Sequence, residues 1–163
     1  MNRVMAIPTL IAILAAAAPL TAMGFEYWPG LAPCALCLWQ RWPYWVAAGL
    51  ALVALPAPPR LRTWLLGGAG LAVAVSGGIA ALHLGVEQGW WPSPLPACLA
   101  PGVGVGASID DLLRNLAPLP TKPCDEPAYL IPGLPLSVAA MNLIYAALLA
   151  GWTLRRARRE WRI

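Results

Sequence analysis

Four apolar stretches, each about 20 residues long, constrain the fold more than any other feature of this sequence. At a rise of about 1.5 Å per residue, a helix of that length spans the ~30 Å hydrocarbon core of a bilayer. Backbone amides in lipid must be paired within their own segment, and the stretches lack the alternation of membrane strands, so we expect helices. The stretches cover residues 4–23, 36–55, 64–86 and 136–154.

Composition favours the same fold class. Apolar residues make up 60% of the chain and charged residues 11%, whereas soluble domains carry about 25% charged residues. The mean hydropathy is +0.65. We therefore predict an all-α membrane protein, with residues 1–163 forming one bundle of four transmembrane helices. The first stretch exceeds the ~7–15 residues of a signal-peptide core and lacks a clear A-x-A site, so we expect it to be retained.

The charges predict how the bundle is oriented. Six of the seven acidic residues fall on one side, and eight of the eleven basic residues fall on the side that carries both termini. By the positive-inside rule we expect both termini to be cytoplasmic and loops 24–35 and 87–135 to lie on the outer side of the membrane. The net charge of +4 thus indicates orientation and lipid contact rather than a nucleic-acid partner. The eight basic residues are Arg3, Arg60, Arg62, Arg155, Arg156, Arg158, Arg159 and Arg162.

Cys34 and Cys37 form a C-x-x-C motif where the second stretch begins. Unpaired N–H groups and the helix dipole favour a thiolate at a helix N-terminus. Arg41 lies one helical turn after Cys37, and its side chain tilts back toward that sulfur. We therefore interpret Cys37 as the stabilised thiolate and Cys34 as the sulfur exposed to exchange. Arg41 would neutralise the thiolate or hold an electron-rich carbonyl ligand, although snorkelling to the headgroups also explains it.

A C-x-x-C motif can also belong to a structural disulfide or to half of a zinc site. Zinc usually requires a second close pair, whereas Cys98 and Cys124 are 26 residues apart and His83 is the single histidine. We therefore expect a redox pair and no metal site, with structural disulfides as the alternative.

Cys98 and Cys124 bracket a Pro- and Gly-rich part of the longest loop. A disulfide between them would be an exposed bridge, open to attack by a thiolate of another protein. It would equally serve as a staple worth ~3–4 kcal/mol. Between them, residues 108–116 read as a short amphipathic helix capped by Ser108.

Electrons that enter a dithiol at a membrane edge need a lipid-soluble acceptor, and quinone is the obvious one. The sequence contains no nucleotide-binding glycine loop. His83, near the outer end of the third stretch, is placed to hydrogen-bond a quinone carbonyl or to relay protons. An interfacial histidine without such a role fits the sequence equally well.

Together these motifs resemble those of the disulfide bond formation protein B (DsbB) family of bacterial inner-membrane oxidoreductases. The resemblance implies a four-helix bundle that reoxidises a periplasmic thioredoxin-like oxidase of the DsbA type and passes the electrons to quinone, either ubiquinone or menaquinone. The resemblance rests on Pro33-Cys-Ala-Leu-Cys-Leu-Trp-Gln-Arg41 with Tyr44, His83-Leu-Gly-Val-Glu-Gln-Gly-Trp90, Cys98, Lys122-Pro-Cys124 and Gly133-Leu-Pro-Leu-Ser137 with Asn142.

The resemblance also implies residue roles. A thiolate of the partner would attack Cys98, the released Cys124 would attack Cys34, and Cys37 would pass the electrons to quinone beside Arg41. Two other functions remain open at this point. One is a quinone reductase of the vitamin K epoxide reductase type, whose C-x-x-C is expected late in the bundle. The other is a non-catalytic membrane scaffold with structural disulfides.

Overall fold

The computed structural model describes residues 3–28, 30–95, 98, 122–130, 133 and 135–161. Across these residues the elements are helices, accompanied by two isolated β-bridges, so the predicted all-α class is confirmed there. The predicted helix at residues 108–116 lies outside the described ranges. The helices are α1 (Arg3–Tyr27), α2 (Ala35–Trp39), α3 (Trp42–Val53), α4 (Pro59–Glu87) and α6 (Val138–Trp161).

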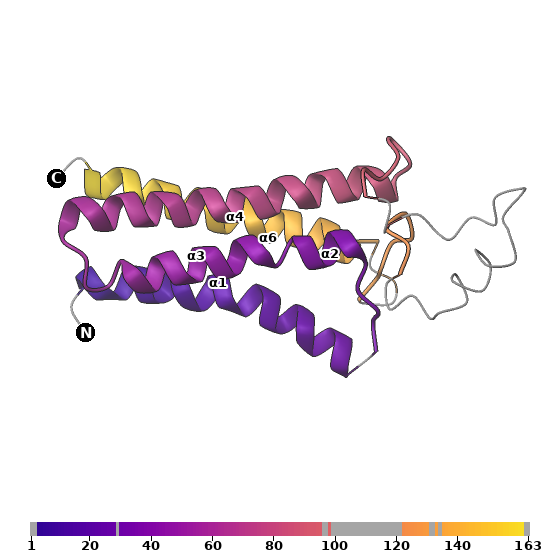
Figure 1. Ribbon diagram of the computed structural model, residues 1–163, viewed down its shortest axis with the longest axis horizontal. Coiled ribbons are helices and arrows are strands. Elements are labelled where there is room, and N and C mark those ends of the chain that lie inside the picture. The colour runs from indigo at the N-terminus through magenta and orange to yellow at the C-terminus, as the bar shows by residue number, and fades with distance from the viewer. Residues whose placement is uncertain are drawn as a thin grey trace, which may run out of the picture.

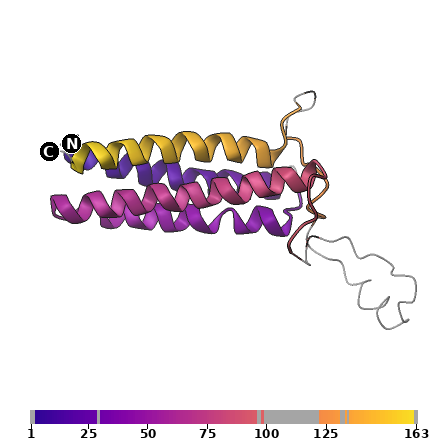
Figure 2. The same cartoon turned by 90° about the horizontal axis from the view of Figure 1, so that it is seen from above.

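The helices lie side by side in an elongated bundle (Figures 1 and 2). The start of α1 and the end of α6 share one end of the bundle, and α2 lies at the other end, where the cysteine-bearing segments gather. By length and composition, three helices are able to cross a membrane: Met5–Tyr27, Pro59–Glu87 and Val138–Glu160. This is consistent with a multi-pass membrane protein.

The second apolar stretch differs from its prediction, because residues 36–55 do not form one continuous helix. α2 ends at Trp39 and α3 begins at Trp42. Pro43, in the first turn of α3, has no N–H, and its ring would clash with the carbonyl of Trp39 in a regular helix. The break leaves the main-chain carbonyl of Gln40 free of helical bonds, since the Tyr44 N–H bonds to the Arg41 carbonyl instead.

The other three helices extend beyond or shift from their apolar stretches. α1 continues past residue 23 to Tyr27, and α4 begins at Pro59 rather than at residue 64. A helix can continue beyond the hydrocarbon core because polar residues at its end are in contact with water there. α6 starts two residues later than predicted. Ser137 caps it, accepting a hydrogen bond from the Ala140 N–H at 3.2 Å.

Small side chains allow the helices to pack closely toward the end that carries the termini. α4 packs along α6, and α1 packs along α3. A Cβ added to Gly70 of α4 would lie 2.8 Å from the Leu154 side chain of α6, so the close approach of these helices requires glycine there. An ion pair of 3.1 Å between Arg62 and Glu160 also joins the two helices. The buried core includes Ile11, Ala15, Ala47, Ala51, Leu66, Ala69, Val73, Ala146 and Ala150.

Candidate active site

The C-x-x-C pair lies at the start of α2. Cys34 is the N-cap of this helix, and its sulfur accepts a hydrogen bond from the Cys37 N–H at 3.1 Å. The two sulfurs are 2.6 Å apart, with the Cys34 thiol donating to Cys37. This hydrogen bond, together with burial, raises the pKa of the Cys34 thiol. The proton of the reduced pair therefore stays on Cys34, which leaves Cys37 as the sulfur that carries charge.

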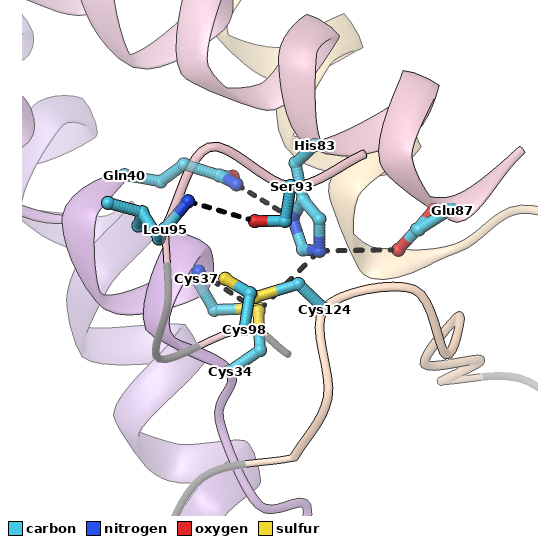
Figure 3. Close-up of a disulfide and its surroundings, with 9 residues drawn as sticks. All are labelled: Cys34, Cys37, Gln40, His83, Glu87, Ser93, Leu95, Cys98 and Cys124. Carbon is cyan, nitrogen blue, oxygen red and sulfur yellow. Dashed lines mark hydrogen bonds and ion pairs between the residues drawn. A yellow bond between two sulfur atoms is a disulfide. The ribbon is translucent and has the colours of Figure 1, made fainter. Parts of the chain in front are cut away.

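Burial separates the two sulfurs in a way the sequence did not predict. Cys34, expected to be the exposed sulfur, is only 4% exposed, whereas Cys37 is half-buried. Cys34 packs in one cluster with Cys98 and Cys124, beside Val86 of α4 (Figure 3). Cys34, the more buried cysteine of the dithiol, is thus the one that packs against the Cys98 and Cys124 pair.

Cys98 and Cys124 are joined in a disulfide. The expectation of an exposed bridge is wrong, because Cys98 is 2% exposed and Cys124 is 0% exposed. The Lys122 N–H bonds to the Pro33 carbonyl, which docks the 122–124 segment beside the start of α2, and the Cys124 N–H bonds to the carbonyl of its disulfide partner Cys98. A segment that is remote in sequence therefore brings this disulfide directly against the start of α2.

His83 lies on the Cys34 side of the pair and is 3% exposed. Its Nε2 is 3.5 Å from the Cys34 sulfur and 3.8 Å from a carboxylate oxygen of Glu87 (Figure 3). Its Nδ1 is 3.0 Å from the side-chain nitrogen of Gln40. The imidazole therefore faces the cysteine cluster directly, near the C-terminal end of α4.

A cavity of about 320 Å³ opens on the other side of the dithiol, between α1, the α2–α3 break and α6. Most of its wall is apolar, and its few polar groups converge where Cys37 lies. Such an enclosure, apolar with a small number of placed polar groups, is typical of sites for small organic ligands. The polar side chains on its wall include Glu26, Cys37, Gln40, Arg41, Tyr44 and Asn142. His83 is not among the described residues that line the cavity.

Arg41 borders the same cavity as Cys37, but its guanidinium is held by an ion pair with Glu26 of α1. The Nε of Arg41 is buried and has no hydrogen-bond partner among the described residues. A buried donor without a partner costs free energy, so this atom is suited to an acceptor on a bound molecule. Sequence analysis missed Glu26; the available signal was a lone acid just beyond the first apolar stretch.

Polar side chains connect α3, α4 and α6 to Gln40 beneath the dithiol. The resemblance named Gln40, Tyr44 and Asn142, but neither their connection nor Ser76 was predicted from the sequence. The Tyr44 hydroxyl donates to Asn142 Oδ1 at 2.7 Å, and Asn142 Nδ2 donates to Gln40 Oε1 at 2.7 Å. Ser76 Oγ donates to the main-chain carbonyl of Gln40 at 2.8 Å. A serine and an asparagine within otherwise apolar stretches were the sequence signal, because polar groups in a membrane segment need partners.

Cys34, Cys37 and His83 also bring three potential metal-ligand atoms within 4.8 Å of one another. Zinc accepts this type of donor set, but structural zinc sites use four protein ligands and the described residues supply three here. The absence of a metal site stays a prediction from the sequence.

Comparison with known proteins shows the family of this chain. The family model described as disulfide bond formation protein DsbB matches residues 4–155. A protein of Azoarcus sp. (strain BH72) named disulfide bond formation protein B is 30% identical over 164 residues, covering 93% of this chain and 95% of that protein. No solved structure matches the chain. The chain therefore belongs to the DsbB family, which makes it an oxidoreductase that acts on disulfides.

Proposed function

We propose that this protein is a membrane dithiol:quinone oxidoreductase that reoxidises a periplasmic thioredoxin-like oxidase of the DsbA type. One observation carries the proposal. The C-x-x-C pair lies between the Cys98–Cys124 disulfide, packed against Cys34, and an apolar cavity bordered by Cys37. Electrons can therefore enter the pair from a protein disulfide on one side and leave it toward a lipid-soluble acceptor on the other.

The proposed topology uses α2 and α3 together as a fourth membrane span. Their combined range, Ala35–Val53, matches the second apolar stretch, and α3 packs against both α1 and α4. With both termini at one end of the bundle, the excess of arginine there favours a cytoplasmic position in the bacterial inner membrane. The cysteine end and residues 87–135 would then face the periplasm.

Electron transfer would proceed by four thiol–disulfide exchanges. A thiolate of the partner attacks Cys98, which forms a mixed disulfide and releases Cys124 as a thiolate. Cys124 then attacks Cys34 of an oxidised Cys34–Cys37 pair, and Cys37 leaves as a thiolate. The second thiol of the partner resolves the mixed disulfide, so the partner loses two electrons and Cys98 leaves as a thiolate. Cys98 then attacks Cys124 in its bond to Cys34, which restores the Cys98–Cys124 disulfide and leaves the two electrons on Cys34 and Cys37. Because Cys98 is buried, the first attack requires displacement of the groups that cover it.

The cavity beside Cys37 fits a quinone ring. Its wall is largely apolar, and the unpartnered Nε of Arg41 supplies a donor suited to a carbonyl oxygen. When bound, the quinone would take up the two electrons and two protons that regenerate the disulfide. Arg41 would hold the ring and neutralise charge near Cys37, while Glu26 would fix the position of Arg41. For His83 we propose a role at Cys34, since Cys34 is the sulfur that it faces.

The testing experiment follows quinone absorbance under anaerobic conditions after a reduced thioredoxin-like dithiol is added to the purified protein. The wild type should consume oxidised quinone, and Cys37→Ser should not. Both proteins should bind the same partner, which controls for misfolding of the variant. If neither the wild type nor the variant consumes ubiquinone or menaquinone with a competent partner, the proposal fails and a structural role for the disulfides is favoured.

A further inference from the structure

Hydrogen bonds link Ser76, Asn142, Gln40 and His83 beneath the dithiol. Which group donates in each of these bonds can be assigned from Ser76. Ser76 Oγ lies 2.8 Å from the main-chain carbonyl of Gln40, and a carbonyl oxygen can only accept. The Ser76 hydroxyl proton is therefore committed to that carbonyl. Ser76 Oγ is left as an acceptor toward the side chain of Asn142, 3.4 Å away, so the amide of Asn142 must present its NH₂ group on this side.

The direction passes from Asn142 to His83 through Gln40. The Asn142 NH₂ group donates to the side-chain oxygen of Gln40 at 2.7 Å. Because the oxygen of the Gln40 amide faces Asn142, its NH₂ group faces His83 Nδ1, at 3.0 Å. Two N–H groups cannot share one hydrogen bond, so Nδ1 must be the acceptor and carries no proton. The ring proton is placed on Nε2, because the bond at one ring nitrogen sets the tautomer at the other.

We propose that Ser76, Asn142 and Gln40 are positioning residues that fix His83 in its Nε2–H tautomer and aim that N–H at the sulfur of Cys34. The distance from Nε2 to the Cys34 sulfur is 3.5 Å. The Cys37 N–H donates to the same sulfur at 3.1 Å. In this tautomer Nε2 is a donor, so it neither removes the proton of Cys34 nor ligates a metal ion. The carboxylate of Glu87, 3.8 Å from Nε2, and the main-chain carbonyl of Cys124 are the other acceptors beside this N–H.

The redox consequence rests on the function proposed above. A reduced sulfur accepts a hydrogen bond more strongly than a disulfide sulfur, especially once it is a thiolate. The Nε2–H group therefore favours the dithiol over the disulfide in the exchange of the Cys34–Cys37 pair with two molecules of glutathione. Because Cys34 keeps its proton in the reduced pair, loss of the donor should shift this equilibrium toward the Cys34–Cys37 disulfide by about two- to tenfold, the typical effect of a hydrogen bond between neutral groups.

The tautomer can be measured directly, because His83 is the single histidine of the chain. In protein labelled with ¹⁵N-histidine, nitrogen NMR distinguishes a protonated from an unprotonated ring nitrogen. We expect the proton on Nε2 and an unprotonated Nδ1. A proton on Nδ1, or on both nitrogens, would overturn the proposal. The measurement needs neither quinone nor a partner, so it stands even if quinone reduction is not found.

A variant of Asn142 tests the relay at a distance, since Asn142 bonds to Gln40 and Ser76 but not to His83. In Asn142→Asp the side chain can only accept, so the Gln40 amide must turn and present its oxygen to His83. The proton should then move to Nδ1. Tyr44→Phe is the matched control, because it removes a hydroxyl from the same asparagine without removing the Ser76 anchor. An unchanged tautomer in folded Asn142→Asp would sink the relay.

The redox effect needs a double-mutant cycle, because the new carboxylate also disfavours thiolates through its charge. Asn142→Asp is compared with the wild type, and the same change is made in a His83→Phe background, with each Cys34–Cys37 pair equilibrated against glutathione. We expect a shift about two- to tenfold larger when His83 is present. Equal shifts in both backgrounds would show that His83 transmits nothing to the cysteines.

Discussion

Cys34 and Cys37 are separated by one turn of α2, yet they belong to two very different regions of the molecule. Cys37 borders an apolar cavity between α1, α3 and α6. Cys34 is buried among a disulfide and the imidazole of His83 (Figure 3), and it is not one of the described residues that line that cavity. One short helix can therefore present two sulfurs to two partners of different chemistry. A protein thiol and a lipid-soluble oxidant would each meet its own sulfur.

The largest expected effect is loss of partner capture at Cys98, on the Cys34 side of the dithiol. In a background without Cys34 and Cys37, Cys124→Ser should capture a single-cysteine partner that is activated as a mixed disulfide with thionitrobenzoate. Cys98 then attacks, and no second thiol can resolve the product. Cys98→Ser should capture none. Non-reducing gels and release of the coloured thiol measure both, and capture by Cys98→Ser would transfer the attacked position to Cys124.

Removing the unpartnered donor should impair the cavity region alone. Arg41→Met is expected to raise the KM for quinone about 10- to 100-fold, because a hydrogen bond from a charged group is lost. Capture of the partner through Cys98 should be unchanged. Arg62→Met is the matched control, since Arg62 is also ion-paired but lies near the other end of the bundle. An unchanged KM for Arg41→Met would remove this residue from the quinone site.

Alkylation of the reduced protein should reveal the difference between the two sulfurs. At pH 7 iodoacetamide should modify Cys37 about tenfold faster than Cys34, because the thiolate is the reactive form. The hydrogen bond to Cys37 and burial raise the pKa of Cys34, so its thiol form persists to higher pH than in an ordinary cysteine. Modification of Cys34 should therefore increase only in alkaline solution, as read by peptide mass spectrometry. In unfolded protein the two rates should converge; faster reaction of Cys34 in the folded protein would reverse the assignment.

The smallest effect concerns the support of Arg41 rather than Arg41 itself. Glu26→Gln keeps the size of the side chain but removes the charge that pairs with Arg41. Both side chains are partly exposed, so the pair should be worth no more than ~1 kcal/mol. We expect the KM for quinone to rise by at most about fivefold, with Glu160→Gln as the control at the opposite end. A loss as large as that of Arg41→Met would give Glu26 a direct role in the site.

Apolar length and charge distribution were sufficient to predict helices and their approximate positions, because both are properties of short segments. The exception was the second stretch, where Pro43 divides the helix into α2 and α3. The break was not predicted, because the hydrophobicity of a stretch does not depend on whether proline lacks an N–H. The consequence is functional, since the break releases the Gln40 carbonyl to anchor Ser76.

The cysteine motifs were also readable, but their surroundings were not. The C-x-x-C spacing predicted a redox pair or half of a metal site, and the position before an apolar stretch placed it near a membrane surface. Spacing could not predict that Cys98 and Cys124 would be buried against Cys34, since the exposure of a loop depends on what it docks against. It could not pair Arg41 with Glu26 either, because those residues meet only where α1 lies beside the α2–α3 break.

By itself, the sequence determined the helical membrane fold, the dithiol at a helix start and the family to which the chain belongs. Each of these follows from composition, periodicity or residues that are close in the chain. Only the tertiary structure decided which sulfur faces the cavity, which faces the disulfide, and that His83 lies beside Cys34 rather than on the cavity wall. Those outcomes depend on contacts between helices remote in sequence, from Gln40 to His83 and to Asn142, which only packing brings together.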